Sequence, residues 1–183
     1  MCGIIGYTGN GNAVPKMTEG LSVLEYRGYD SVGIAAQTND GISVVKCKGR
    51  IQTLKEKREL SKLSASCAIG HTRWATHGAP TRRNAHPHLS EDGRFAVVHN
   101  GIIENYLELR DELTKKGYRF DSQTDTEVIV HLLELYDSGD FKETVMKATA
   151  RLTGSYALGI LCADCPGSIF AVREASPLIL GIG

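Results

Sequence analysis

Segments with the alternating pattern of a β-strand gather at the two ends of the chain, and most helical segments lie between them. Strands are predicted at residues 3–8, 32–37, 42–47, 67–72, 94–99, 156–163, 168–173 and 178–182, with a hairpin turn at 39–41. Apolar residues at helical spacing predict helices at 14–24, 52–63, 105–116, 125–136 and 141–152. This order lacks strict βαβ alternation and favours helices packed on antiparallel sheet. The predicted class is α+β.

The length and composition suit one globular domain over residues 1–183, of which 42% are hydrophobic. The formal net charge is zero and no tract concentrates either sign, which argues against nucleic acid or an anionic membrane as a partner. The chain has neither a leader-like start nor an apolar stretch of membrane-spanning length, so a cytoplasmic protein is expected. The apolar end at 178–183 predicts that further domains follow in the natural protein.

The five cysteines do not suggest a disulfide framework, because their number is odd. Cys47 and Cys67 stand in predicted strands, where a buried free thiol is ordinary. Cys162 and Cys165 have the spacing of half a zinc site, but the sequence offers no second pair.

Cys2 is the first candidate for chemistry, because it follows the initiator methionine. Removal of Met1 would leave one residue with a thiol of pKa about 8.5 and an α-amine of pKa about 8. The amine can then accept the thiol proton, so a separate histidine is not required. The alternative is a small apolar residue entering a strand, and position alone favours that alternative.

Residues 73–93 form a long segment without periodicity, which is typical of a functional loop. Arg73 could bind a carboxylate in bidentate fashion, and the alternative is a surface ion pair at Arg73 with Trp74 in the core. Arg27 could line a pocket, while Gly28 is expected as a left-handed cap of the first helix.

Two further motifs each have a structural and a chemical interpretation. Asn100-Gly101 is a hairpin turn signal that could end the strand 94–99, or a pair of donors for an oxyanion. The segment 124–127 matches a capping box, with Thr124 as N-cap and Glu127 reaching back, while Asp125 could instead bind a substrate ammonium.

Histidines offer two rival hypotheses. His71, His77 or His99 could serve as the base of a cysteine–histidine hydrolase. Alternatively, His86 and His88, with His77 or His99, could bind a metal in a regulatory module, although no acidic ligand or fixed spacing supports a metal site.

Seven segments together resemble the glutaminase domain of the class II, N-terminal-nucleophile amidotransferases. They run in the family's order at residues 1–4, 25–31, 71–78, 84–88, 98–105, 124–127 and 176–178. The forms at Tyr29, Trp74 and His77, with Ala-His-Pro-His at 85–88, look like the branch that aminates fructose 6-phosphate rather than the phosphoribosyl branch. The resemblance implies a four-layer αββα sandwich of two antiparallel sheets flanked by helices.

The resemblance also implies roles for individual residues. Cys2 would attack the side-chain amide of L-glutamine, with Asn100 and Gly101 as the oxyanion hole. The remaining implied contacts are Arg73 to the α-carboxylate, Asp125 to the α-ammonium, polar contacts from Thr76, His77 and Gly101, and a pocket or gate from Arg27, Trp74 and His86.

The implied reaction hydrolyses glutamine to glutamate and ammonia through a γ-glutamyl thioester, without a metal or an organic cofactor. Ammonia would pass to a C-terminal sugar-isomerase part that binds fructose 6-phosphate and forms glucosamine 6-phosphate. A homodimer is implied for the full-length protein. Without the acceptor part, the chain is expected to be a glutaminase.

Overall fold

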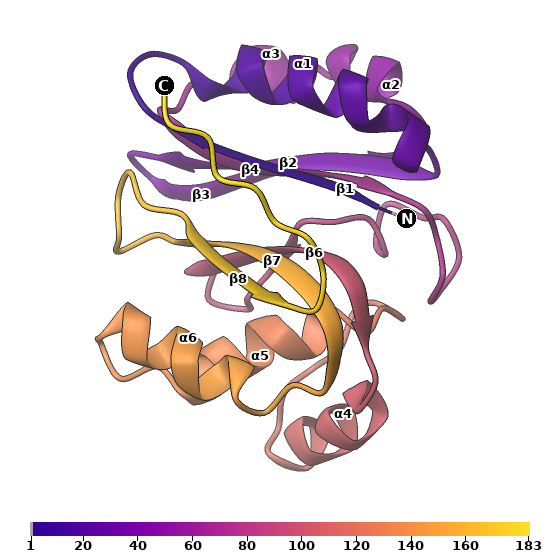
Figure 1. Cartoon of the computed structure of the whole chain (residues 1–183), viewed down its shortest axis with the longest axis vertical. Coiled ribbons are helices and arrows are strands. Elements are labelled where there is room, and N and C mark those ends of the chain that lie inside the picture. The colour runs from indigo at the N-terminus through magenta and orange to yellow at the C-terminus, as the bar shows by residue number, and fades with distance from the viewer. Residues whose placement is uncertain (1) are drawn as a thin grey trace.

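Two antiparallel four-stranded sheets lie face to face, and helices cover the outer face of each (Figure 1). The structure is a computed structural model that describes residues 2–183. The predicted α+β class and the four-layer αββα arrangement are confirmed. The expected removal of Met1 concerns a residue outside the described range.

The first sheet is built from the first 73 residues. Its strands, in spatial order, are β1 (Gly3–Thr8), β4 (Cys67–Arg73), β2 (Ser31–Thr38) and β3 (Gly41–Lys48). The predicted hairpin joins β2 to β3, and Gly41 takes φ +108°, a value that side chains rarely allow. On the outer face, α1 (Ala13–Leu24) buries Val14, Met17 and Leu21. The predicted apolar stripe therefore faces the sheet.

The helix predicted at 52–63 is two short helices instead. These are α2 (Ile51–Lys55) and α3 (Arg58–Ser61), separated where Lys57 takes an extended conformation. The break lets both pieces bury leucines, Leu54 in the first and Leu60 in the second. The prediction of one continuous helix is therefore wrong, because the extended Lys57 redirects the chain between the two pieces. A 3₁₀ turn, η1 (Glu25–Arg27), follows α1.

The second sheet comes from the rest of the chain. Its strands, in spatial order, are β5 (His88–Leu89), β6 (Phe95–Ile103), β7 (Gly154–Cys162) and β8 (Phe170–Glu174). Its outer face is covered by α4 (Tyr106–Lys115), α5 (Glu127–Leu135) and α6 (Phe141–Thr149). Phe141 of α6 stacks on Phe95 and meets the edge of Phe170, which ties this helix to the sheet.

Short and medium apolar side chains fill the space between the sheets. Ala35, Ile69, Ala96, Val98 and Leu161 are all fully buried there. Every residue of β4 is buried, because helices cover one face of its sheet and the second sheet covers the other. This central layer brings the ends of β1, β4 and β6 together.

Two strand predictions are wrong. Residues 178–182 form no strand; the end of the chain runs from β8 toward the first sheet, with Ile179 91% and Ile182 102% exposed (Figure 1). The strand predicted to end at residue 99 continues to Ile103, because Asn100 and Gly101 pair with Ala157 and Tyr156 of β7. Within residues 2–183, no helix has the length and apolar character needed to cross a membrane.

Candidate active site

Cys2 directly precedes β1, one residue before the first paired position. Gly3 is opposite Thr72 in the ladder, so continuing the register places Cys2 opposite Arg73. The Cys2 sulfur accepts a hydrogen bond from the Trp74 backbone N–H at 3.4 Å, and Arg27 Nε donates to the Cys2 carbonyl at 3.1 Å. The thiol and the backbone of this residue are therefore both held by neighbours.

The charges around Cys2 act on its thiol in opposite directions. Burial raises the pKa of the Cys2 thiol, whereas the Trp74 N–H and the Arg73 charge lower this pKa and the Asp125 carboxylate raises it. Burial lowers the pKa of the Arg73 guanidinium, whereas the nearby charges of Cys2, Asp30 and Asp125 raise this pKa. A thiol, a cation and an anion thus act on one another in a single region.

Gly28 and Asp30 brace the beginning of the long loop. A β-carbon on Gly28 would stand 2.5 Å from the Arg73 carbonyl carbon and 2.7 Å from the Trp74 nitrogen. Asp30 accepts a hydrogen bond from the Ala75 N–H at 2.8 Å. The left-handed cap predicted at Gly28 is wrong, since its φ is −177°; glycine is needed here for close backbone packing.

Arg73 is 3% exposed, and its guanidinium donates to backbone carbonyls of its own loop. It bonds His77 O, Gly78 O at 3.3 Å and Ala79 O at 3.4 Å. The expected alternative, a surface ion pair, is not the arrangement found. Three of the five N–H groups of the guanidinium are used in this way, which leaves two for a ligand.

Trp74, Thr76 and His77 lie at the opening of the loop. Trp74 is 45% exposed and meets the edge of the Tyr29 ring, so the alternative of a core tryptophan is wrong. The Thr76 hydroxyl lies 3.2 Å from His77 Nδ1, and the His77 ring meets the edge of Tyr106. These three side chains line a rim that solvent can reach.

Asn100 and Gly101 form no turn, contrary to the Asn-Gly signal. Gly101 has φ +139°, and a β-carbon there would stand 2.0 Å from Ser155 O. The short β5 pairs only with Ala96 and Val97, so in residues 2–183 the edge of β6 at Asn100 has no strand beside it. The Asn100 side chain makes no hydrogen bond with any described residue. Both residues therefore have donor groups available.

Asp125 precedes α5 rather than lying in its first turn. Its Oδ2 accepts from the Ile103 N–H at 2.9 Å. The capping box is also wrong, because Glu127 accepts from the backbone of Asp121 and Ser122 and the Thr124 hydroxyl contacts His88 Nε2. Asp125 is thereby fixed against the end of β6, which is the strand that carries Asn100 and Gly101.

Four histidines are buried beneath this region: His71, His86, His88 and His99. Burial lowers the pKa of the His71 ring to about 3, and it lowers the pKa of the other three as well. In residues 2–183 the Cys2 sulfur hydrogen-bonds only with Trp74, so none of these rings nor His77 makes a hydrogen bond with it. Within the same range, no three or more His, Cys, Asp or Glu side chains are grouped so that they could hold a metal ion.

Sequence reasoning did not single out two residues that hold the site. Asp30 is one residue of the segment 25–31 and has no predicted role of its own, although it anchors the Ala75 N–H. Thr126 is fully buried and contacts His99, His86 and Asp125. Its position directly after Asp125 was the available signal, since a hydroxyl beside a candidate binding carboxylate can orient it.

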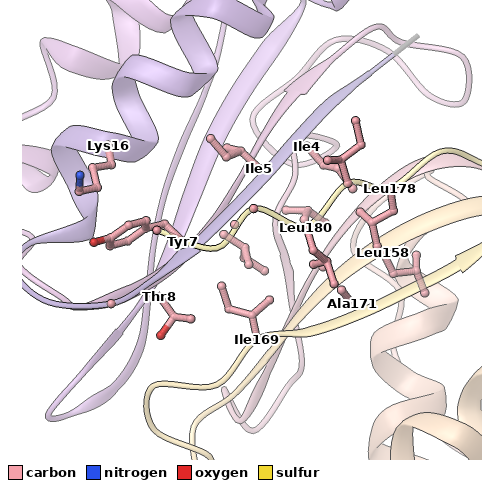
Figure 2. A pocket seen from close by; sticks show the side chains of 18 of the residues that line it. Ile4, Ile5, Tyr7, Thr8, Lys16, Leu158, Ile169, Ala171, Leu178 and Leu180 are labelled. Atoms are coloured by element: carbon pink, nitrogen blue, oxygen red, sulfur yellow. The ribbon is translucent and has the colours of Figure 1, made fainter.

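A separate cavity of about 770 Å³ lies beside β1, between the two sheets and the end of the chain (Figure 2). Its wall includes Ile4, Tyr7, Leu158, Ile169 and Leu180. None of the predicted site residues lines it, so the cavity and the Cys2 region are distinct.

Known proteins share both sequence and fold with this chain. The sequence pattern of the glutamine amidotransferase domain matches residues 71–181. Glutamine–fructose-6-phosphate aminotransferase (isomerizing) of Clostridium tetani is 54% identical over 183 residues, which are 100% of this chain and 30% of that protein. The protein of the same name from Thermus thermophilus is 51% identical with the same coverage. The chain thus spans 30% of the length of these relatives.

Solved structures give the same fold. Glutamine phosphoribosylpyrophosphate amidotransferase from B. subtilis, solved with ADP and GMP, has a TM-score of 0.79 and 30% identity over 89% of this chain and 35% of its own. A glutamine aminotransferase class-II domain protein from Silicibacter pomeroyi has a TM-score of 0.59, at 15% identity over 98% of this chain and 79% of that one. The second likeness concerns the fold alone.

Proposed function

Since the chain belongs to the glutamine amidotransferase domain family, we propose that it hydrolyses the side-chain amide of L-glutamine with Cys2 as the nucleophile. The observation that carries the proposal is that the Cys2 thiol, the Arg73 cation and the Asp125 carboxylate lie close enough to act on one another. The Cys2 sulfur bonds the Trp74 N–H and is influenced by the charges of both Arg73 and Asp125. The α-carbon of glutamine carries both a carboxylate and an ammonium, which a cation and an anion near the thiol would suit.

Arg73 would bind the α-carboxylate and Asp125 the α-ammonium of glutamine. Arg73 supports this role because its loop contacts leave two N–H groups for a carboxylate. Asp125 is buried and has its orientation set by the Ile103 N–H. Thr76, His77 and Gly101 would supply further polar contacts at the rim. Arg27 and His86 would hold the pocket through the Cys2 backbone and the buried layer beneath it.

The reaction would begin when the α-amine of Cys2, freed by removal of Met1, takes the thiol proton. The sulfur attacks the carboxamide carbon, and the Asn100 amide with the Gly101 N–H stabilises the oxyanion. The α-amine then passes the proton to the amide nitrogen of the substrate. This nitrogen leaves as ammonia, so a γ-glutamyl thioester remains on Cys2. Water then cleaves the thioester, which releases glutamate and restores the thiol.

For the whole protein, we propose that ammonia is transferred to fructose 6-phosphate to give glucosamine 6-phosphate. This rests on the name of the relatives, of whose length the chain spans 30%. A sugar-isomerase part outside residues 1–183 would bind the sugar phosphate, and Trp74, exposed at the rim, would gate the passage of ammonia. A cytoplasmic homodimer is the proposed state of the full-length protein.

The test compares proteins with and without Met1, separated by intact mass, for glutamate release from glutamine. Protein without Met1 should be active, Cys2→Ala should lose at least about a thousand-fold, and Cys165→Ala, the change of another partly exposed cysteine, should stay active. Full activity in the Met1-retaining fraction would show that the α-amine is not the base. Activity that survives Cys2→Ala would show that Cys2 is not the nucleophile.

A further inference from the structure

We propose that a hydrogen-bond chain from His99 through Thr126 to Asp125, supported by His86, positions the Asp125 carboxylate for the α-ammonium of glutamine. Thr126, His99 and His86 are positioning residues in this account, because they act through Asp125. The inference rests on the proposed glutaminase function and assigns a task to the buried histidines that the reaction itself does not use.

The buried rings lie in contact beneath the site. His86 stacks on His71 with centroids 4.1 Å apart and an interplanar angle of 16°. The His86 centroid is also 6.4 Å from that of His99. His71 belongs to β4 of the first sheet and His99 to β6 of the second, so the rings join the two sheets on the strands that carry Arg73 and Asn100.

The backbone contacts fix the tautomers of two rings. His71 Nε2 lies 2.8 Å from the His99 carbonyl, which only accepts, so Nε2 carries the proton. His86 Nδ1 accepts from the His99 backbone N–H at 3.3 Å, so Nδ1 has no proton and Nε2 has one. Burial keeps both rings neutral by lowering their pKa values. His86 Nε2–H therefore points to Thr126 Oγ1, 3.4 Å away.

The Thr126 hydroxyl sets the donor-to-acceptor direction of the hydrogen-bond chain. Its oxygen lies 2.8 Å from His99 Nδ1 and 3.4 Å from Asp125 Oδ1. If the hydroxyl donated to His99, then His99 Nε2, which has no partner among the described residues, would be a buried N–H without an acceptor. A buried donor without an acceptor is costly, whereas a bare lone pair costs less. The favoured order is His99 Nδ1–H to Thr126 Oγ1–H to Asp125 Oδ1.

Both oxygens of Asp125 are then engaged by fixed donors. Oδ1 accepts from Thr126 and Oδ2 from the Ile103 N–H at 2.9 Å. These bonds hold the plane of the carboxylate, and each oxygen keeps lone pairs for a bound ammonium. Removing the Thr126 hydroxyl would free one end of the carboxylate and leave the sulfur of Cys2 unaffected.

The experiment compares Thr126→Val, which removes the hydroxyl, with Thr126→Ser, which keeps it. Thr124→Val is the matched control, because Thr124 is equally buried and its hydroxyl contacts His88 rather than Asp125. Glutaminase kcat and KM are measured beside two alkylation rates of Cys2. One reagent is a diazoketone analogue of glutamine, which has the α-ammonium, and the other is iodoacetamide, which lacks it.

Thr126→Val should raise KM for glutamine about ten-fold and should slow the alkylation of Cys2 by the glutamine analogue about as much. The kcat value and the iodoacetamide rate should stay within about two-fold, Thr126→Ser should restore KM, and Thr124→Val should leave it unchanged. If Thr126→Val does not fold, Thr126→Cys, whose thiol is a weaker donor, should raise KM instead.

An unchanged KM in Thr126→Val or Thr126→Cys, or an equal rise in Thr124→Val, would overturn the positioning role while glutaminase activity stands. A wild-type chain that lacks Met1 and releases no glutamate would overturn the proposed function, and with it this inference.

Discussion

The backbone N–H of Trp74 donates to the sulfur of Cys2 at 3.4 Å and so joins the residue after β4 to the residue before β1. The bond depends on how closely Gly28 packs on the Arg73–Trp74 peptide, because a β-carbon there would stand 2.7 Å from the donating nitrogen. The position of the nucleophile is therefore set by a segment 26 residues further along the chain.

Gly28→Ala should lower kcat/KM for glutamine at least about ten-fold. The added methyl group must displace the Arg73–Trp74 backbone, which moves the N–H away from Cys2, and such overpacking costs about 1–3 kcal/mol of stability. Glutaminase assays with urea unfolding measure both effects. Gly181→Ala, where nothing lies within 4 Å of the new atom, is the control and should match the wild type.

Arg73→Lys should raise KM for glutamine at least about ten-fold, because an ammonium cannot hold the carbonyls of residues 77–79 and a carboxylate together. Steady-state kinetics against glutamine concentration provide the measurement. Arg83→Lys, at an exposed position of the same loop, should leave KM unchanged. If KM does not change in Arg73→Lys either, Arg73 does not bind the carboxylate.

Lys46→Met should destabilise the chain by about 1–3 kcal/mol, which for this size lowers Tm by roughly 2–4 °C per kcal/mol. The Lys46 ammonium donates to Ala85 O at 2.7 Å and Pro87 O at 2.9 Å, on either side of His86. Thermal unfolding measures the loss. Lys48→Met, two residues along the same strand and exposed, serves as the control. Equal Tm values for the two variants would contradict a structural role for the Lys46 contacts.

Stability should fall as the pH is lowered below about 6.5. Burial lowers the pKa of His71 to about 3, and that of His86, His88 and His99 also, whereas the unfolded rings return to about 6.5. Between these values the unfolded state binds more protons, so each ring removes up to about 1.4 kcal/mol per pH unit. Urea titrations from pH 8 to pH 5 should show this slope of the unfolding free energy for the wild type. The slope should be shallower for His88→Gln. The same slope in both proteins would contradict the assignment.

Local patterns predicted most of the secondary structure. Alternation located seven of the eight predicted strands, and the turn at Gly41 was specified by its own residues. The exception at 178–182 is instructive, because an apolar run is a strand only if another strand pairs with it. In the described chain no partner strand lies beside these residues.

The geometry of the site depended on contacts that sequence spacing does not contain. Asn100-Gly101 has the composition of a turn, yet pairing with β7 keeps both residues in the strand. Thr124 and Glu127 have capping-box spacing, but His88 and the backbone of Ser122 engage them instead. Each partner is distant in sequence or belongs to a loop, so tertiary structure overrides the local preference.

The layers also set the order in which the protein can assemble during its synthesis. All four strands of the first sheet lie within residues 3–73, whereas the last strand of the second sheet ends at Glu174. At about 5–20 residues per second, translation needs roughly 5–20 seconds to supply the roughly 100 residues between them. During that interval the inner apolar face of the first sheet would lack the second sheet that covers it, and a nascent chain with such a face exposed is prone to aggregate.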